Sequence, residues 1–315
     1  MKDITFDNKD KMAIIGLGTW KSDKGLVYKA VRRAIEVGYR HIDCAAIYGN
    51  EAEIGEAFAD AFKAGDIKRE DLWVTSKLWN TAHKAAAVKP ALEKTLADLQ
   101  LEYLDLYLMH WPIAMKEGAG FPFKGEDFYT LDEVPLEETW EAMLKEKQEG
   151  LVNHTGVSNF HIGNLETLGR IEFPEMNQVE MHPFLPQQKL VDYCKAKGIN
   201  MTAYSPLGSM DRPARAKQEN EPMLMEQPVV QKIAEKHGAS PAQILINWSV
   251  HRGIAVIPKS TNDQRIADNF QAAAIELTTQ EVEHIDGIQS GFRFIDGSIW
   301  VREGSPYALE DLWEL

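Results

Sequence analysis

The sequence predicts an α/β protein of the (β/α)8 TIM-barrel class, with an N-terminal hairpin, long loops and an irregular C-terminal tail. Eight short apolar segments are each followed by an amphipathic segment with helical spacing. This alternation is typical of parallel strands joined by right-handed crossovers. The eight units occupy about 250 residues, the usual size of such a barrel. Each apolar segment also ends in a polar or aromatic residue.

The expected strands are short, apolar and β-branched in places, as buried parallel strands are. They lie at 14–20, 39–45, 72–78, 103–110, 152–159, 176–181, 199–206 and 254–260. A hairpin precedes them, because 4–6 and 12–15 alternate apolar and polar residues around the turn Asn8-Lys9-Asp10.

The expected helices are marked by their ends as well as by their apolar spacing. Gly38, Gly150 and Gly198 each stop a helical pattern. Ser240 and Pro241 supply an N-cap and a first-turn proline. The helices lie at 24–37, 50–62, 84–99, 136–148, 162–169, 187–197, 229–237, 241–251, 262–273 and 279–288. With long loops at 111–134 and 207–227 and a tail to Leu315, we expect a single domain over 1–315.

A doubly wound open sheet is the rival architecture. When that fold binds a dinucleotide, it places a glycine fingerprint directly after its first strand. Here Gly16 and Gly18 have no third glycine at the required spacing. The barrel is therefore the better prediction.

The composition limits the partners of the protein. A net charge of −14 argues against nucleic acid and anionic membranes, so any anionic ligand needs a local cationic pocket. Cys44 and Cys194 are the only cysteines, and we expect two buried free thiols and no metal site. The first twenty residues resemble neither a signal peptide nor a membrane span. We expect a cytoplasmic monomer that acts on a small molecule.

Titratable side chains end three consecutive predicted strands. Asp43 ends one strand, Lys77 the next and His110 the third, while Tyr48 follows Asp43 in the connecting loop. Barrel enzymes use the C-terminal ends of their strands, and neighbouring strands bring those ends together. We therefore expect these four side chains to converge.

The four residue types suit carbonyl reduction. A phenol has a pKa of ~10 and is a poor acid at neutral pH. The Lys77 ammonium would lower the pKa of Tyr48, and Asp43 would orient that ammonium. His110 would hydrogen-bond a carbonyl oxygen and direct it. A hydride that reaches the carbonyl carbon then needs a proton at oxygen, which Tyr48 would deliver.

The chain resembles the aldo-keto reductases, and within them the aldehyde reductase (NADP-dependent alcohol dehydrogenase) branch. The matching stretches span nearly the whole chain: GLGTWKS (16–22), GYRHIDCAAIYGNE (38–51), VTSKLWNT (74–81), LADLQLEYLDLYLMHWP (96–112), GVSNF (156–160), NQVEMHP (177–183), TAYSPLGS (202–209) and IPKS (257–260). The resemblance implies a catalytic tetrad of Asp43, Tyr48, Lys77 and His110, and NADPH/NADP+ bound in an extended form.

The resemblance also implies a set of cofactor residues. Tyr204 would stack on the nicotinamide, and Ser158, Asn159 and Gln178 would bind its carboxamide. Asp211 would clasp Lys21 and Lys259 over the pyrophosphate, and Arg265 would meet the 2′-phosphate that distinguishes NADP. The remaining expected contacts are Gly18, Thr19, Trp20, Ser205, Leu207, Ser209, Ser260, Asp268 and Asn269.

The expected substrate pocket is aromatic, which implies aldehydes with a compact or aromatic body. Its residues follow strand ends or lie in the long loop and the tail: Trp20, Ile47, Trp79, His110, Trp111, Phe121, Phe123 and Trp300. Two other functions stay open. One is a non-catalytic NADP-binding regulatory subunit of the same fold, which a lost tetrad residue would favour. The other is a phosphate-handling barrel lyase or isomerase, in which Tyr204 and Arg265 have no role.

Overall fold

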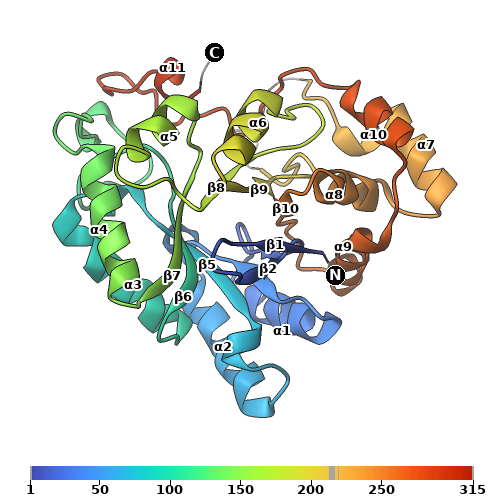
Figure 1. The fold of residues 1–315 in the computed structure, drawn as a ribbon, viewed down its shortest axis with the longest axis horizontal. Helices are drawn as coiled ribbons and strands as arrows, with labels where there is room; N and C mark the ends of the chain where they lie inside the picture. The colour runs from blue at the N-terminus through green and yellow to red at the C-terminus, as the bar shows by residue number, and fades with distance from the viewer. Residues whose placement is uncertain (1, 213–216, 219, 314–315) are drawn as a thin grey trace.

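A computed structural model describes residues 2–212, 217–218 and 220–313. Eight parallel strands form one sheet in the order β10-β9-β8-β7-β6-β5-β4-β3, and helices surround it (Figure 1). The strands are β3 (Leu17–Gly18), β4 (His41–Asp43), β5 (Trp73–Leu78), β6 (Leu104–Met109), β7 (Val152–Ser158), β8 (Met176–Glu180), β9 (Asn200–Tyr204) and β10 (Ala255–Val256). The predicted architecture is confirmed.

The sheet closes through bridges between its first and last strands. Ile15 pairs with Val256, and Gly18 pairs with Lys259, both in parallel. A Cβ on Gly18 would lie 2.6 Å from the carbonyl oxygen of Ile257. Gly18 therefore permits the close backbone approach at the seam. β3 and β10 are shorter than the predicted strands because the seam consists of single bridges rather than continuous ladders.

Most helices lie within two or three residues of their predicted bounds. Two of them, α7 and α10, pack against each other beside the barrel. The helices are α1 (Val27–Val37), α2 (Glu51–Ala64), α3 (Ala85–Leu99), α4 (Leu136–Gln148), α5 (Ile162–Leu168), α6 (Gln188–Ala196), α7 (Pro228–His237), α8 (Pro241–His251), α9 (Asp263–Gln271) and α10 (Thr279–Asp286).

The N-terminal hairpin covers the end of the barrel where the strands begin. It consists of β1 (Asp3–Thr5) and β2 (Lys11–Ala13). The Phe6 ring stacks on Trp73 with 5.0 Å between ring centroids and lies 4.2 Å from the His154 ring. The hairpin does not cover the opposite end of the barrel, where the strands finish, and a functional site can open there.

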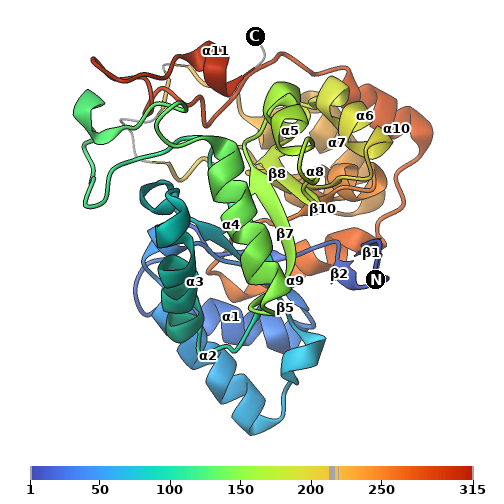
Figure 2. The same cartoon turned by 60° about the vertical axis from the view of Figure 1, so that its left-hand side comes forward.

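The C-terminal tail is more ordered than the predicted irregular segment. It contains α11 (Leu309–Leu312), and it lies away from β1 and β2 in both views (Figures 1 and 2). The Tyr307 hydroxyl accepts a hydrogen bond from the N–H of Ala114 and donates one to the carbonyl of Tyr129. A second apolar cluster, separate from the main core, therefore joins the tail to the 111–134 loop. Its buried members are Trp111, Ile113, Met115, Phe128, Trp300, Tyr307, Leu312 and Trp313.

Candidate active site

A cavity of about 1040 Å³ opens at the C-terminal ends of the strands. Residues from the strand ends, the loops that follow the strands, the start of α8, α9 and the tail line it. All the predicted site residues line this cavity except Lys77, which is fully buried next to it. The structure therefore brings together residues that lie more than 280 positions apart in the sequence, from Gly18 to Trp300.

Asp43 and Lys77 form a buried ion pair at the floor of the cavity. Lys77 Nζ lies 2.5 Å from Asp43 Oδ1 and donates a second hydrogen bond, over 2.7 Å, to the carbonyl of Cys44. Burial opposes the charged amine, but the charges of Asp43 and Tyr48 raise the pKa of Lys77 above its usual value. The ammonium therefore stays charged in spite of its burial.

Tyr48 ends a short 3-10 helix, η1 (Ala46–Tyr48), that follows β4. Gly49 comes next with φ of 67°, a left-handed conformation that favours glycine. Lys77 Nζ lies 5.2 Å from the centroid of the Tyr48 ring. Burial raises the pKa of Tyr48 to about 12, although the charge of Lys77 lowers it. The expected net lowering is wrong here, because desolvation of the phenolate outweighs the nearby cation.

The His110 ring stands edge-on to Tyr48, with 5.9 Å between ring centroids, and 5.3 Å from Trp79. Burial, Lys77 and His83 all hold the pKa of His110 well below its usual value. The imidazole is therefore neutral at pH 7 and carries a single N–H. Its orientation against Tyr48 gives the cavity two polar groups side by side.

Polar side chains from β7, β8 and β9 form a network beside this pair. The Tyr204 hydroxyl donates to Asn159 Oδ1 over 2.7 Å, and Ser158 Oγ donates to the carbonyl of Gln178 over 2.8 Å. Gln178 Nε2 donates to Asp43 Oδ2 over 2.7 Å. Sequence reasoning placed Gln178 at the site but missed its bond to Asp43, which crosses the barrel.

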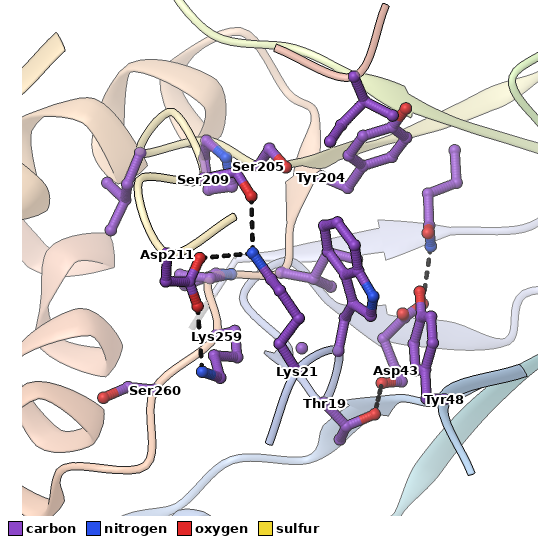
Figure 3. Close-up of a pocket in the computed structure, with 18 of the residues that line it drawn as sticks. Thr19, Lys21, Asp43, Tyr48, Tyr204, Ser205, Ser209, Asp211, Lys259 and Ser260 are labelled. Carbon is purple, nitrogen blue, oxygen red and sulfur yellow. Dashed lines mark hydrogen bonds and ion pairs between the residues drawn. The ribbon is translucent and has the colours of Figure 1, made fainter. Parts of the chain in front are cut away.

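Asp211 bridges two lysines, Lys21 and Lys259, as Figure 3 shows. Its two carboxylate oxygens lie 2.5 Å from Lys21 Nζ and 3.2 Å from Lys259 Nζ. Lys21 also donates to Ser209 Oγ over 2.9 Å. The contacts joining the 207–212 segment to the two lysines are therefore those expected from the sequence.

The far end of the cavity lies at the N-terminus of α9. Asn262 caps this helix by accepting a hydrogen bond from the N–H of Arg265. The Arg265 side chain is exposed, and it forms no ion pair with any residue that the structure describes. The Asp268 carboxylate accepts a hydrogen bond from Gln264 instead. An unpaired cation at a helix N-terminus is left facing the cavity.

Aromatic rings wall the end of the cavity near His110. The Trp300 ring stacks on Phe123 at 5.4 Å and lies 5.8 Å from Trp79. Ile47 and Phe121 stand at the mouth and are about half exposed. Further lining residues, most of them apolar, were not predicted from the sequence: Pro206, Met210, Met225, Ser240, Ala242, Ile257, Pro258, Thr261, Asn262, Ile295 and Ile299.

The closed barrel and the tyrosine, lysine and histidine at its strand ends define a (β/α)8-barrel oxidoreductase. Comparison with known proteins narrows this class. A family model described as "Aldo/keto reductase family" matches residues 14–290. The chain belongs to the aldo/keto reductase family. This membership supports an activity on carbonyl groups and a nicotinamide cofactor.

Individual relatives agree with the family match. The chain is 48% identical to an aldo/keto reductase of Synechocystis sp. over 100% of its own length and 97% of the relative's. It is 49% identical to aldo-keto reductase family 1 member A1 of Bos taurus, covering 90% and 88% of the two chains. A solved aldose reductase from Schistosoma japonicum superposes with a TM-score of 0.85 at 40% identity, covering 94% and 95%.

Helices long and apolar enough for a membrane span do not occur in the part of the chain that the structure describes. Cys44 and Cys194 are both buried and unbridged.

Proposed function

We propose that this protein reduces aldehydes to alcohols with NADPH, and that Tyr48 donates the proton to the carbonyl oxygen. The observation that carries the proposal is the placement of Tyr48 and His110 in one cavity, with the Lys77–Asp43 ion pair buried directly beneath. All four residues are present and close together, which disfavours a non-catalytic regulatory subunit.

Proton donation by Tyr48 depends on the positive charge of Lys77 beneath it. With a pKa of about 12, Tyr48 is fully protonated at neutral pH and available as a donor. As its proton leaves, negative charge develops on the phenolic oxygen. The Lys77 ammonium, held by Asp43, stabilises that charge in a low-dielectric site where electrostatic interactions are strong. Lys77 therefore assists the transfer without changing its own protonation.

His110 directs the substrate. Its pKa is depressed, so a neutral ring with one N–H faces the cavity, and it can donate to the carbonyl oxygen without competing as the acid. A bond from His110 and a bond from Tyr48 to the same oxygen would polarise the carbonyl and fix its orientation. Trp79 holds the His110 ring edge-on and so restricts its rotation.

The residues present fit a nicotinamide dinucleotide. When bound, the nicotinamide supplies the hydride to the carbonyl carbon. Gln178 uses its Nε2 on Asp43, which leaves Oε1 to accept from a carboxamide N–H. Tyr204 presents an aromatic face to a flat ring, and its bond to Asn159 sets the tilt of that face. The contacts of Asp211 with Lys21 and Lys259 would hold the 207–212 segment over the pyrophosphate.

The helix end at α9 supports NADP over NAD. Arg265 lines the cavity and has no ion-pair partner among the residues that the structure describes. Arg265 lies in the first turn of α9, where the helix dipole disfavours a cation but favours a phosphate. A 2′-phosphate there would satisfy both Arg265 and the helix terminus. Ser260 also lines the cavity, and its Oγ accepts a hydrogen bond from the N–H of Asn262, the N-cap of α9.

The direct test is the consumption of NADPH, followed by its absorbance, over a panel of aldehydes, aldoses and ketones. We expect turnover with aldehydes, faster with NADPH than with NADH, and greatest for aromatic or compact bodies that fit between Trp79, Trp111 and Trp300. Absence of turnover with every carbonyl, despite tight NADPH binding, would overturn the catalytic proposal and favour the regulatory one.

A further inference from the structure

We propose that Glu180 is a positioning residue that holds the C-terminal tail over the substrate end of the cavity and so sets which aldehydes fit. The inference rests on the proposed aldehyde reduction. It concerns a residue that does not line the cavity. Glu180 is the last residue of β8, and its side chain is fully buried.

The carboxylate of Glu180 binds the backbone of the tail. The N–H of Phe294 donates to Oε1 over 2.6 Å, and the N–H of Ile295 donates to Oε2 over 2.7 Å. Both oxygens of one side chain thus hold two successive amides of a segment that is 114 positions away. Hydrogen bonds to an ionised acceptor are roughly twice as strong as neutral ones. Such a clamp fixes both the position and the direction of the chain.

Neighbouring groups keep this buried carboxylate ionised. Burial raises its pKa, but the hydrogen bond from His182, the charge of Arg293 and the bond from Phe294 bring the pKa of Glu180 below its usual value. His182 Nε2 lies 2.8 Å from Oε1, and the His182 ring packs edge-on against Phe294. Arg293 in turn lies over the Trp313 ring, 3.7 Å from its centroid. The clamp is therefore supported on both sides.

The clamped amides lead directly into the cavity wall. Ile295 lines the cavity, and Ile299 and Trp300 follow it within five positions. The carbonyl of Asp296 accepts a hydrogen bond from Trp313 Nε1 over 2.8 Å, which folds the tail back on itself. Trp300 is the ring that contacts Trp79, Trp111 and Phe123. Loosening residues 294–295 would therefore shift this wall.

Strand β8 links the tail to the reacting groups. Side chains two apart on a strand point to the same side, so Gln178 and Glu180 both project into the barrel. Gln178 reaches Asp43, and Glu180 reaches the tail. Strand β8 thus sets the position of the tail segment that lines the cavity relative to the Asp43–Lys77 ion pair.

The test is the isosteric variant Glu180→Gln, which replaces one acceptor oxygen with an amide donor. One of the two tail amides then faces a donor and loses its bond. We expect KM for benzaldehyde, which needs the aromatic wall, to rise roughly 10-fold. We expect KM for propanal, which is too small to reach the wall, to change less than about 2-fold. We expect kcat to stay nearly constant for both.

A double-mutant cycle with Trp300→Ala tests the route of the effect. If Glu180 acts through the tail wall, Glu180→Gln will have little further effect on the benzaldehyde KM once Trp300 is removed. Additive losses, or an equal rise in KM for both aldehydes, would overturn the proposal. The matched control is Glu146→Gln, which alters another buried glutamate, on the outer helix α4, and should leave both KM values unchanged.

A readout independent of turnover separates this inference from the proposed function. Hydrogen exchange of the Phe294 and Ile295 amides should be slow in the parent protein and at least 10-fold faster in Glu180→Gln. If the protein is inactive towards all aldehydes but shows this exchange pattern, the proposed reductase function is wrong, while the proposal that Glu180 holds the tail stands. Equal exchange rates in the parent and the variant would show that Glu180 does not hold the tail, whether or not the protein reduces aldehydes.

Discussion

Gln178 Nε2 donates a hydrogen bond to Asp43 Oδ2 over 2.7 Å, although the two residues are 135 positions apart. Their strands, β8 and β4, are four places apart in the closed eight-stranded sheet and so face each other across the barrel. The second oxygen of Asp43 holds Lys77. A single carboxylate therefore ties the cation beneath Tyr48 to a residue proposed to bind the nicotinamide.

This bond predicts a combined effect on affinity and rate. Gln178→Met keeps the length of the side chain but removes both the donor to Asp43 and the free amide oxygen. We expect NADPH to bind roughly 10-fold more weakly and kcat to fall as well, because a buried carboxylate oxygen loses its partner. Fluorescence titration and steady-state kinetics measure the two effects. Unchanged affinity with unchanged kcat would show that the bond is dispensable.

Tyr48→Phe separates chemistry from binding. The ring and its packing remain, but the proton donor is lost. We expect NADPH affinity to change by less than about 2-fold and kcat to fall by roughly 10²–10⁴. Tyr28→Phe is the matched control, since the Tyr28 hydroxyl bonds to Asp60 at the surface, away from the cavity. A Tyr48→Phe enzyme that kept most of its kcat would show that another group is the acid.

Arg265→Ala tests the choice between NADP and NAD. Removing the cation should weaken NADPH by about 10-fold or more and leave NADH nearly unchanged, because only NADPH carries the 2′-phosphate. The dissociation constants of both cofactors are measured by the quenching of protein fluorescence. Arg170→Ala, which removes an exposed arginine two residues after α5, controls for the change in net charge. An equal loss for both cofactors would contradict the proposed phosphate contact.

Glu51 makes a prediction about stability and pH. It is buried and accepts hydrogen bonds from Ser76 over 2.5 Å and from Thr95 over 3.1 Å. Burial raises its pKa from 4.5 to about 7. The folded state therefore holds the Glu51 proton more tightly than the unfolded state does. The stability that this bound proton contributes is lost as the pH rises from 4.5 to about 7.

Glu51→Gln should remove this loss, which is about 3 kcal/mol. Urea unfolding at pH 4.5 and at about pH 7 measures the free energy of unfolding at both ends of that range. Between these two values it should fall less in the variant than in the parent. Glu235→Gln, on the exposed surface of α7, is the control and should follow the parent. Parallel curves for Glu51→Gln and the parent would contradict the raised pKa.

The strand-end residues could be predicted because they depend on two local patterns. Apolar runs mark the strands, and the polar residue that ends each run lies at the C-terminal edge, where neighbouring strands meet. Asp43, Lys77 and His110 followed from this rule alone. Arg265 was implied by the family resemblance, and its place at a helix N-terminus, where the dipole disfavours a cation, agrees with an anion site.

The tail could not be predicted in the same way. Its helix α11 is four residues long and has no clear periodic signal. Its position depends on Glu180, Tyr307 and Trp313, whose partners lie far away in the chain or in another loop. The alternation of Gln178 and Glu180 on β8 was visible in the sequence, but nothing there identified the partner of the second residue.

The sequence by itself determined the barrel, the order of its elements and the residues at the strand ends, because these follow from hydrophobic period, helix caps and glycines that act over a few positions. Only the tertiary structure decided the seam at Gly18, the bond between Gln178 and Asp43, and the placement of the tail. It also decided the pKa of Tyr48, since desolvation depends on everything packed around the phenol, and that quantity is set by the whole fold rather than by neighbours in the chain.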